Sequence, residues 1–400
     1  MDATKKHVLG TRALNRATLA RQLLLRRSAM GAGDAVAHLL GLQAQNVKPP
    51  YFQLWSRLEG FEPAALAALM ESREVLRMVT MRSTIHTHTA EDALVLRPLV
   101  QPARDREINN FRKGLVDVDL PRLADLSRRF VEAEPRTMAE IREELLKEWP
   151  HADPPALSVA ARCLLPLVQV TPRGVWGRSG QVRLTTLDNW LGRKESGGGD
   201  APDHAPGAGA GTGTALDATV LRYLAAFGPA SVQDMQTWAG LTRLREAFER
   251  LRPRLVTFRS DSGAELFDLP DALRPDEDTP APARFLPEFD NLLLSHADRT
   301  RVVPEEYRGR TWQGNQARCT FLVDGFLAGI WRLEQPKGGA AAVLTVEPFG
   351  RLTRQQRAEL TAEGQDLLAA MTETGEGDVR FGSVDGGPPT SAGRSSVNRG

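Results

Sequence analysis

Two glutamines separated by one small apolar residue are the side chains of this chain best suited to positioning a water molecule. Residues 41–45 form the string Gly-Leu-Gln-Ala-Gln, so the two amides belong to Gln43 and Gln45. The string ends an apolar pattern of helical period that predicts a helix over 34–45. Two amides at this spacing can direct their oxygens at one water. Taken alone the motif is weak, because an exposed helix end also carries polar residues.

The amide chemistry limits the reactions that Gln43 and Gln45 can assist. An amide has no pKa near neutrality, so neither side chain can take a proton from water as an aspartate does. Two amide oxygens can instead orient a water molecule and stabilise a developing positive charge through their dipoles. Such assistance is sufficient only where the leaving group is already activated.

A cation and an aromatic ring follow the glutamines, as Lys48 and Tyr51, with Pro49-Pro50 between them expected to end the helix. The net charge of the whole chain is +1, but residues 1–57 hold nine basic residues against two acidic ones, a local charge of +7. This excess suits a face that binds nucleic-acid phosphates, with Lys48 and Tyr51 as contacts. A solvated basic helix surface is the alternative.

Arg82 and the string His86-Thr87-His88 form a second candidate group. On a strand the two histidine rings share one face, but no third ligand is near in sequence, so we expect no metal. We interpret Arg82 and His86 as DNA contacts, with a structural histidine as the alternative for His86.

A polar cluster follows an apolar strand near residue 294. We interpret it as a second DNA-binding surface, in addition to the basic face of residues 1–57, with a solvated loop as the alternative. Its candidate contacts are His296, Arg299, Arg301, Arg308 and Arg310.

Length and composition predict two to four domains, since 400 residues with 41% hydrophobic content can bury several cores. The N-terminus lacks the apolar segment of a signal peptide, and no apolar run is long enough to span a membrane, so we expect a cytoplasmic protein. Cys163 and Cys319 lie far apart in apolar contexts and are expected to be buried free thiols.

Three segments repeat one order of short helices followed by two strands joined by a turn, which is typical of winged helices. The predicted fold is therefore α+β, with three tandem winged-helix units in a C-shaped monomer and a β-rich C-terminal subdomain. The predicted parts are a first unit with its helical connection at 1–119, a second unit at 120–193, a flexible Gly/Ala/Pro-rich linker at 194–215, a third unit at 216–280, the β-rich subdomain at 281–381 and a disordered tail at 382–400.

The Gln-Ala-Gln string, the segments 76–92 and 286–299, and the string Val323-Asp324-Gly325-Phe326 to Ile330-Trp331 occur in one order along the chain. Together they resemble the bacterial winged-helix DNA glycosylases of the AlkZ and YcaQ type, over residues 14 to 380. In the YcaQ-type branch the second motif position is an acid, so Gln45 places this chain nearer the AlkZ branch.

The resemblance implies a DNA glycosylase of base excision repair that hydrolyses the N-glycosidic bond of alkylated purines in double-stranded DNA. Gln43 and Gln45 correspond to the catalytic pair, and no cofactor is implied. Because amides supply no proton, the lesion must be cationic, such as N7-alkylguanine or N3-alkyladenine. Members of the AlkZ branch resemble self-resistance proteins that unhook interstrand crosslinks made by genotoxic natural products. Attack by the Lys48 amine, which would give a lyase, is less favoured than a phosphate contact.

A winged-helix transcriptional regulator without catalytic activity is the main alternative function. Three winged units in one chain favour a monomeric clamp, whereas a regulator would be a dimer that binds palindromic DNA. A non-catalytic lesion binder would keep the basic face without needing both glutamines.

Overall fold

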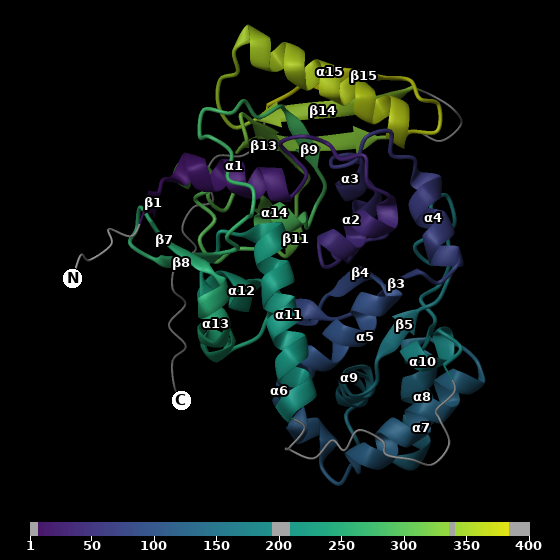
Figure 1. Cartoon of the computed structure of the whole chain (residues 1–400). Coiled ribbons are helices and arrows are strands. Elements are labelled where there is room, and N and C mark those ends of the chain that lie inside the picture. The colour runs from purple at the N-terminus through teal and green to yellow at the C-terminus, as the bar shows by residue number, and fades with distance from the viewer. Residues whose placement is uncertain (1–6, 194–208, 336–340, 384–400) are drawn as a thin grey trace, which may run out of the picture. The chain divides into compact units, whose positions relative to one another are not determined.

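The computed structural model describes residues 7–193, 209–335 and 341–383, without the side chains of 209–212. These residues form two units. The first comprises the described residues up to 281 together with 289–302, and the second comprises 282–288 and those from 303 on. Both units contain helices and sheets, which gives the predicted α+β class (Figure 1). No described helix is both long and apolar enough to cross a membrane.

The helices of the first unit are, in chain order, α1 (Thr11–Arg21), α2 (Ala32–His38), α3 (Pro49–Trp55), α4 (Pro63–Glu71), α5 (Ala90–Leu99), α6 (Gln101–Asn110), α7 (Leu120–Ala133), α8 (Met138–Glu148), α9 (Pro154–Leu164), α10 (Leu187–Trp190), α11 (Gly209–Phe227), α12 (Val232–Ala239), α13 (Arg245–Leu251) and α14 (Asn291–Leu294). Its strands are β1 (Val8–Leu9), β2 (Leu42–Gln43), β3 (Val75–Val79), β4 (Ile85–Thr89), β5 (Leu167–Gln169), β6 (Leu184–Thr186), β7 (Val256–Ser260) and β8 (Glu265–Asp268).

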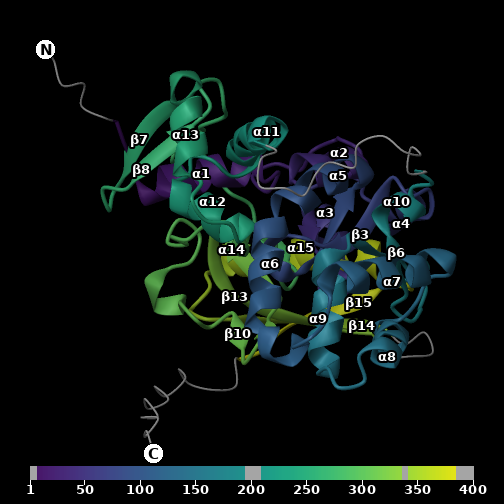
Figure 2. The ribbon, with the colours of Figure 1, turned by 90° about the horizontal axis from the view of Figure 1, so that it is seen from below.

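One antiparallel sheet of the first unit has the order β2-β4-β3-β5-β6. It joins the strands predicted as the wings of the first two units, because Arg77 of β3 pairs with Gln169 of β5. The strands β7 and β8 form the predicted third hairpin, and β1 adds to it in parallel. Figure 2 shows this hairpin beside α13, and α7 and α8 together with α9.

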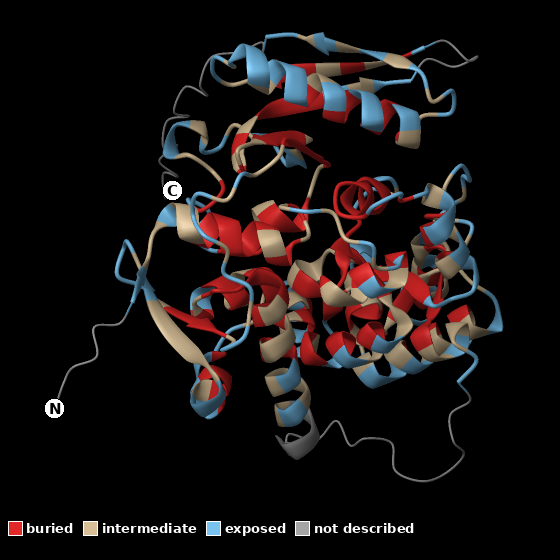
Figure 3. Ribbon diagram, turned by 45° about the horizontal axis from the view of Figure 1, so that its top comes forward, coloured by how far each residue is buried: buried red, intermediate tan, exposed pale blue. Residues whose placement is uncertain are grey.

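The cores of the first unit follow its helices. Helix α9 packs against α6, α7 and α8 around Leu157 and Ala160, which are fully buried. A second cluster joins α11, α12 and α13 through aromatic rings that include Phe227, Trp238 and Phe248. In Figure 3 the inner faces of these helices are red and many of their outer faces blue, the amphipathic pattern expected of surface helices.

The second unit is a sheet of order β15-β14-β13-β12-β9, covered by one helix. Its elements are β9 (Arg284–Leu286), β10 (Trp312–Gln313), β11 (Gln316–Ala317), β12 (Thr320–Val323), β13 (Phe326–Glu334), β14 (Ala342–Pro348), α15 (Arg354–Met371) and β15 (Gly377–Phe381). Strands β14 and β15 are parallel, so α15 makes the crossover that a parallel pair requires. This helix interrupts the strands of the predicted β-rich subdomain.

Three predictions of local structure are wrong. The helix predicted over 34–45 ends at His38, because Leu40 (φ 55°) and Gly41 (φ 96°) adopt left-handed conformations that no α-helix continues. Pro49-Pro50 begin α3 instead of ending a helix, since a proline at the first helical positions loses no hydrogen bond. Residues 209–215 of the predicted linker belong to α11, whereas 194–208 and the predicted tail from 384 on lie outside the described residues.

A buried ion pair joins α3 to the segment 289–302. Arg57, directly after α3, donates from Nη1 to Asp290 Oδ2 at 2.9 Å and from Nη2 to Asp290 Oδ1 at 2.8 Å, and both side chains are fully buried. Asp290 also accepts from the backbone N–H of Leu292 and so caps α14. The pair explains why a segment predicted to belong to the C-terminal subdomain folds with the first unit.

We expect Asp290→Asn to lower the free energy of unfolding by about 3–5 kcal/mol, because it leaves the Arg57 guanidinium buried without a counter-charge. Asp125→Asn is the matched control, since Asp125 pairs with Arg129 on the surface, with side chains 61% and 67% exposed, and should cost less than about 1 kcal/mol. Urea unfolding measures both losses. Equal losses would contradict the structural role of the Asp290 pair.

Buried histidines make the fold sensitive to acid. His88 on β4 shares a hydrogen bond of 2.8 Å between Nε2 and Thr80 Oγ1, and burial lowers the pKa of His88 to about 4. Burial also lowers the pKa of His86 and of His296, and neighbouring arginines add to both shifts. Below about pH 6.5 the unfolded chain therefore binds protons that the native state excludes.

We expect the free energy of unfolding to fall as the pH drops from about 6.5 toward 4, by up to about 1.4 kcal/mol per pH unit for each buried histidine. His88→Gln should reduce this dependence, and His151→Gln, at an exposed position, should not. Urea unfolding at several pH values between these limits measures the slope. If the pH dependence of the free energy of unfolding is unchanged in His88→Gln, then His88 has the same pKa in the folded and the unfolded state.

Candidate active site

The Gln-Ala-Gln motif lies on and just after the short strand β2. Gln43 pairs with His86 of β4, and the Ala44 N–H continues the ladder to the carbonyl of Ile85 at 2.7 Å. Gln43 therefore lies on extended backbone and not on the expected helix, whereas Gln45 follows in a bend after the strand has ended. Gly41 is required at the turn before the strand, because a Cβ there would lie 2.2 Å from His88 Nδ1.

Strand β2 is an edge strand whose carbonyls are bound by side chains and not by a further strand. Asn291 Nδ2 donates to the Gly41 carbonyl at 2.8 Å, and Gln53 Nε2 donates to the Gln43 carbonyl at 3.1 Å. Arg77 Nη2 donates to the Ala44 carbonyl at 2.8 Å. The backbone of the motif is thus fixed from three separate elements.

The amide of Gln43 is itself held. Its side chain is buried, with 4% of its surface exposed, and Oε1 accepts a hydrogen bond of 2.7 Å from Arg82 Nη2. Arg82 also donates to the backbone carbonyl of Trp238. Burial and the nearby Arg299 lower the pKa of Arg82 to about 10, which leaves it protonated at neutral pH.

Gln45 differs from Gln43 in exposure. It lies at the surface, and its Oε1 accepts only a long contact of 3.5 Å from the Ile85 N–H. A molecule that approaches the motif from solvent therefore meets the Gln45 amide first, whereas the Gln43 amide is buried and held by Arg82.

His86 contributes no proton at this site. Its Nδ1 lies 3.0 Å from the Thr84 carbonyl and so donates there, which leaves Nε2 as an acceptor 3.4 Å from Arg82 Nη2. Burial and Arg82 lower the pKa of His86 well below its ordinary value, so the ring is neutral. The rings of His86 and His88 stack at 5.5 Å, on one face of β4 as the alternation predicted. In the part of the chain that the structure describes, no cluster of three His, Cys, Asp or Glu side chains is arranged to hold a metal ion.

Two of the predicted DNA contacts in the first unit are exposed. Lys48 stands at the start of α3, three residues after Gln45, and Arg299 is close enough to Arg82 to affect its pKa. Both cations lie near the motif, in sequence or in space, and both are exposed at the surface of the protein.

Three other predicted contacts are buried and bonded within the protein. The Tyr51 hydroxyl donates to the Gly174 carbonyl at 2.7 Å, and burial raises the pKa of Tyr51 to about 12. His296 Nε2 lies 2.9 Å from the Phe227 carbonyl, and Arg301 Nη1 donates to the Pro229 carbonyl at 2.8 Å. We therefore do not retain Tyr51, His296 and Arg301 as DNA contacts, because each would have to leave the core to reach a phosphate.

The remaining predicted contacts lie in the second unit. Arg308 pairs with Glu305 on the surface, and the Arg310 guanidinium lies over the ring of Phe349 at 4.2 Å from its centroid. Neither has a contact that excludes DNA. The two cysteines are free: Cys163 is buried as predicted, whereas Cys319 is only partly buried and donates to a Glu288 carboxylate oxygen at 3.2 Å.

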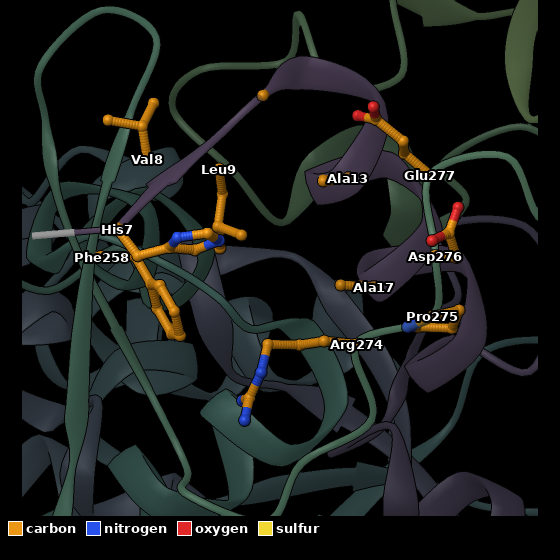
Figure 4. Close-up of a pocket in the computed structure, with 11 residues that line it drawn as sticks. His7, Val8, Leu9, Ala13, Ala17, Phe258, Arg274, Pro275, Asp276 and Glu277 are labelled. Carbon is orange, nitrogen blue, oxygen red and sulfur yellow. The ribbon is translucent and has the colours of Figure 1, made fainter.

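A cavity of about 460 Å³ lies in the first unit between the N-terminal strand and the loop after β8. In Figure 4, Phe258 and Arg274 stand on one side of it, and Asp276 and Glu277 on another. No residue of the Gln-Ala-Gln motif and none of the predicted contacts lines this cavity. Because the two share no lining residue, this cavity is distinct from the candidate active site.

Sequence reasoning missed the residues that fix the motif. Arg77 and Asn291 belong to strings that carried the family resemblance, so their positions were marked although their role was not. Gln53 had no signal, since a glutamine inside an apolar helix gives no hint that it will donate to a strand edge.

The family described as DNA glycosylase AlkZ-like matches residues 36–370. Among solved structures, the Streptomyces sahachiroi DNA glycosylase AlkZ is similar to this chain with a TM-score of 0.71 and 18% identity, covering 94% of this chain and 100% of that one. At this identity the likeness shows a shared fold. No curated protein matches the sequence. The family match spans far more than half of the chain, from before the glutamine motif to the end of α15, so the chain belongs to the AlkZ-like DNA glycosylase family.

Proposed function

We propose that this protein hydrolyses the N-glycosidic bond of cationic alkylated purines in double-stranded DNA, with Gln43 and Gln45 as the catalytic residues. The observation that carries the proposal is an amide pair on a fixed strand edge, beside a protonated arginine and a neutral histidine. This set can position and polarise, but it exchanges no proton near neutral pH.

The charge balance of the reaction explains why such a set would be sufficient. Cleavage of a neutral base from its sugar creates an anion and an oxocarbenium ion, and the anion needs an acid that His86, held neutral, does not supply. In N7-alkylguanine or N3-alkyladenine the base is already positive, so cleavage moves one charge from the base to the sugar. The charge of Arg82 then acts on ground state and transition state alike, and penalises the transition state little.

The amides of Gln43 and Gln45 would have different roles in catalysis. Arg82 occupies one lone pair of Gln43 Oε1 and fixes its direction, whereas the exposed Gln45 Oε1 is nearly unbound and available to a water or to the sugar. We propose that Gln45 contacts the attacking water and that Gln43 completes its orientation. Lys48 is exposed, and an amine in water is not activated as a nucleophile, so we assign it to a phosphate and propose a monofunctional hydrolase.

Several finer parts of the proposal rest on the predicted organisation. We propose a cytoplasmic monomer with three winged-helix units that hold duplex DNA, with Lys48 and Arg299 as contacts near the motif and Arg308 and Arg310 as contacts of the second unit. The exposure of Gln45 leaves room for adducts larger than a methyl group, which supports interstrand crosslinks as substrates and self-resistance to a genotoxic natural product as a role. A DNA-binding regulator would instead be inactive toward lesions and dimeric.

The first test incubates the protein with duplex DNA that carries N7-methylguanine and detects the free base. Gln45→Ala should lower the single-turnover rate about a hundred-fold, because it removes a positioned dipole, while affinity for the damaged duplex stays within about three-fold. Gln45 is the better position for this test, since Gln43→Ala also removes one of the hydrogen-bond acceptors of Arg82.

Gln355→Ala is the control for this experiment, because Gln355 is an exposed glutamine that bonds only to Glu359 along its own helix. It should leave the rate unchanged. Base release at the wild-type rate by Gln43→Ala/Gln45→Ala would sink the proposed mechanism, and no release by the wild-type protein from any cationic lesion would favour the regulator.

Gln45→Asp should extend activity toward neutral adducts, because a carboxylate can act as a base and can stabilise the oxocarbenium ion with a full charge. Asn46→Asp places the same charge one residue away, at another exposed position, and is the matched control. Release of base from neutral lesions by both variants, or by neither while both remain folded, would show that position 45 does not adjoin the reacting sugar.

A further inference from the structure

We propose that Arg82 is a positioning residue that fixes the orientation of the Gln43 amide, and not the DNA contact that its sequence context suggests. This inference rests on the proposed role of Gln43. It assigns Arg82 to the chain of contacts that begins at the end of α12 and ends at the motif.

The chemistry of the two side chains makes the contact directional. A glutamine amide can rotate by half a turn and exchange its oxygen and its NH2 group, whereas a guanidinium offers donors only. Arg82 Nη2 at 2.7 Å therefore accepts only the orientation in which Oε1 of Gln43 faces it. The NH2 group is then turned to the other side, and the amide dipole has one direction.

The guanidinium of Arg82 is already occupied. It donates to Gln43 Oε1 and to the Trp238 carbonyl, and its Nη2 lies 3.4 Å from His86 Nε2. The Nη2 group lies between Gln43 Oε1 and His86 Nε2, so a phosphate could take this group only by displacing one of these two acceptors. The Trp238 carbonyl is in the last turn of α12, where unpaired carbonyls and the helix dipole favour a cation.

The backbone of Arg82 is fixed by the same helix. Arg82 (φ 53°) and Ser83 (φ 58°) form a left-handed turn between β3 and β4. Gly240 ends α12 with φ 71°, and a Cβ there would lie 2.9 Å from the Arg82 backbone nitrogen. Gly240, at the end of α12, thus packs closely against the backbone of the turn, and the Trp238 carbonyl accepts a hydrogen bond from the Arg82 side chain. These two residues lie about 160 positions from Arg82 in sequence, and through Arg82 they fix the orientation of the Gln43 amide.

Arg82→Met tests the assignment, because it removes every donor and adds no amide. We expect the single-turnover rate on N7-methylguanine DNA at saturating enzyme to fall ten- to hundred-fold, with the dissociation constant changed less than about three-fold. Arg82→Lys, which keeps one donor group, should recover part of the rate. Arg243→Met is the matched control, since Arg243 is an exposed arginine that also has a positive φ of 62°.

A double-mutant cycle shows whether Arg82 acts through Gln43. If it does, Arg82→Met/Gln43→Ala should be no slower than Gln43→Ala alone. Multiplied losses would overturn the assignment. A different result would also overturn it: an unchanged rate in Arg82→Met, together with weaker DNA binding and a slope of log K against log salt that is smaller by about one unit. That is the behaviour expected when a phosphate contact is lost.

A second readout does not need activity. In protein labelled with ¹⁵N-glutamine, the side-chain resonance of Gln43 is identified by its loss in Gln43→Ala. It should shift in Arg82→Met and also in Gly240→Ala, which displaces the turn and keeps the arginine, but not in Arg243→Met. An unshifted Gln43 resonance in Arg82→Met would overturn the positioning role, whereas shifted resonances without base release by wild-type protein would refute only the proposed reaction.

Discussion

The outer edge of β2 pairs with side chains and not with another strand. The geometry of the glutamine pair depends on the hydrogen bonds that these side chains donate to the backbone carbonyls. Asn291 and Gln53 donate to carbonyls of this edge. Behind them, the buried pair of Arg57 and Asp290 fixes α3 and α14, the elements that carry those two donors. An edge strand of two residues has few backbone hydrogen bonds of its own, so its position must come from such contacts.

A fixed backbone is what this kind of chemistry requires. Groups that neither gain nor lose a proton can lower a barrier only by being in the right place with their dipoles already oriented. Burial serves the same end here, because it keeps His86 neutral while Arg82, with a pKa of about 10, remains charged. Under the proposed function, such a site selects a leaving group that needs no acid, so that the lesion must bring its own positive charge.

Much of this arrangement could be predicted from sequence, and the failures have physical causes. Periodicity predicted the order of short helices and paired strands, and the family strings located Gln43 and Gln45. The glutamines were placed on a helix because the residues before them have a helical period, and no pattern showed that Leu40 would join Gly41 in a left-handed turn. Tyr51 and Arg301 were predicted to be surface contacts. The sequence does not reveal that each side chain donates to a backbone carbonyl inside the protein.

The central claim is that catalysis here is positioning without proton transfer, and the most direct test is the pH dependence of the bound reaction. The single-turnover rate on N7-methylguanine DNA, divided by the spontaneous rate of base release from the same DNA at each pH, should be flat from about pH 6 to about pH 9. The histidines near the motif titrate below this range and Arg82 above it. A bell-shaped ratio, or an inflection inside this range, would reveal a general acid or base and contradict the account.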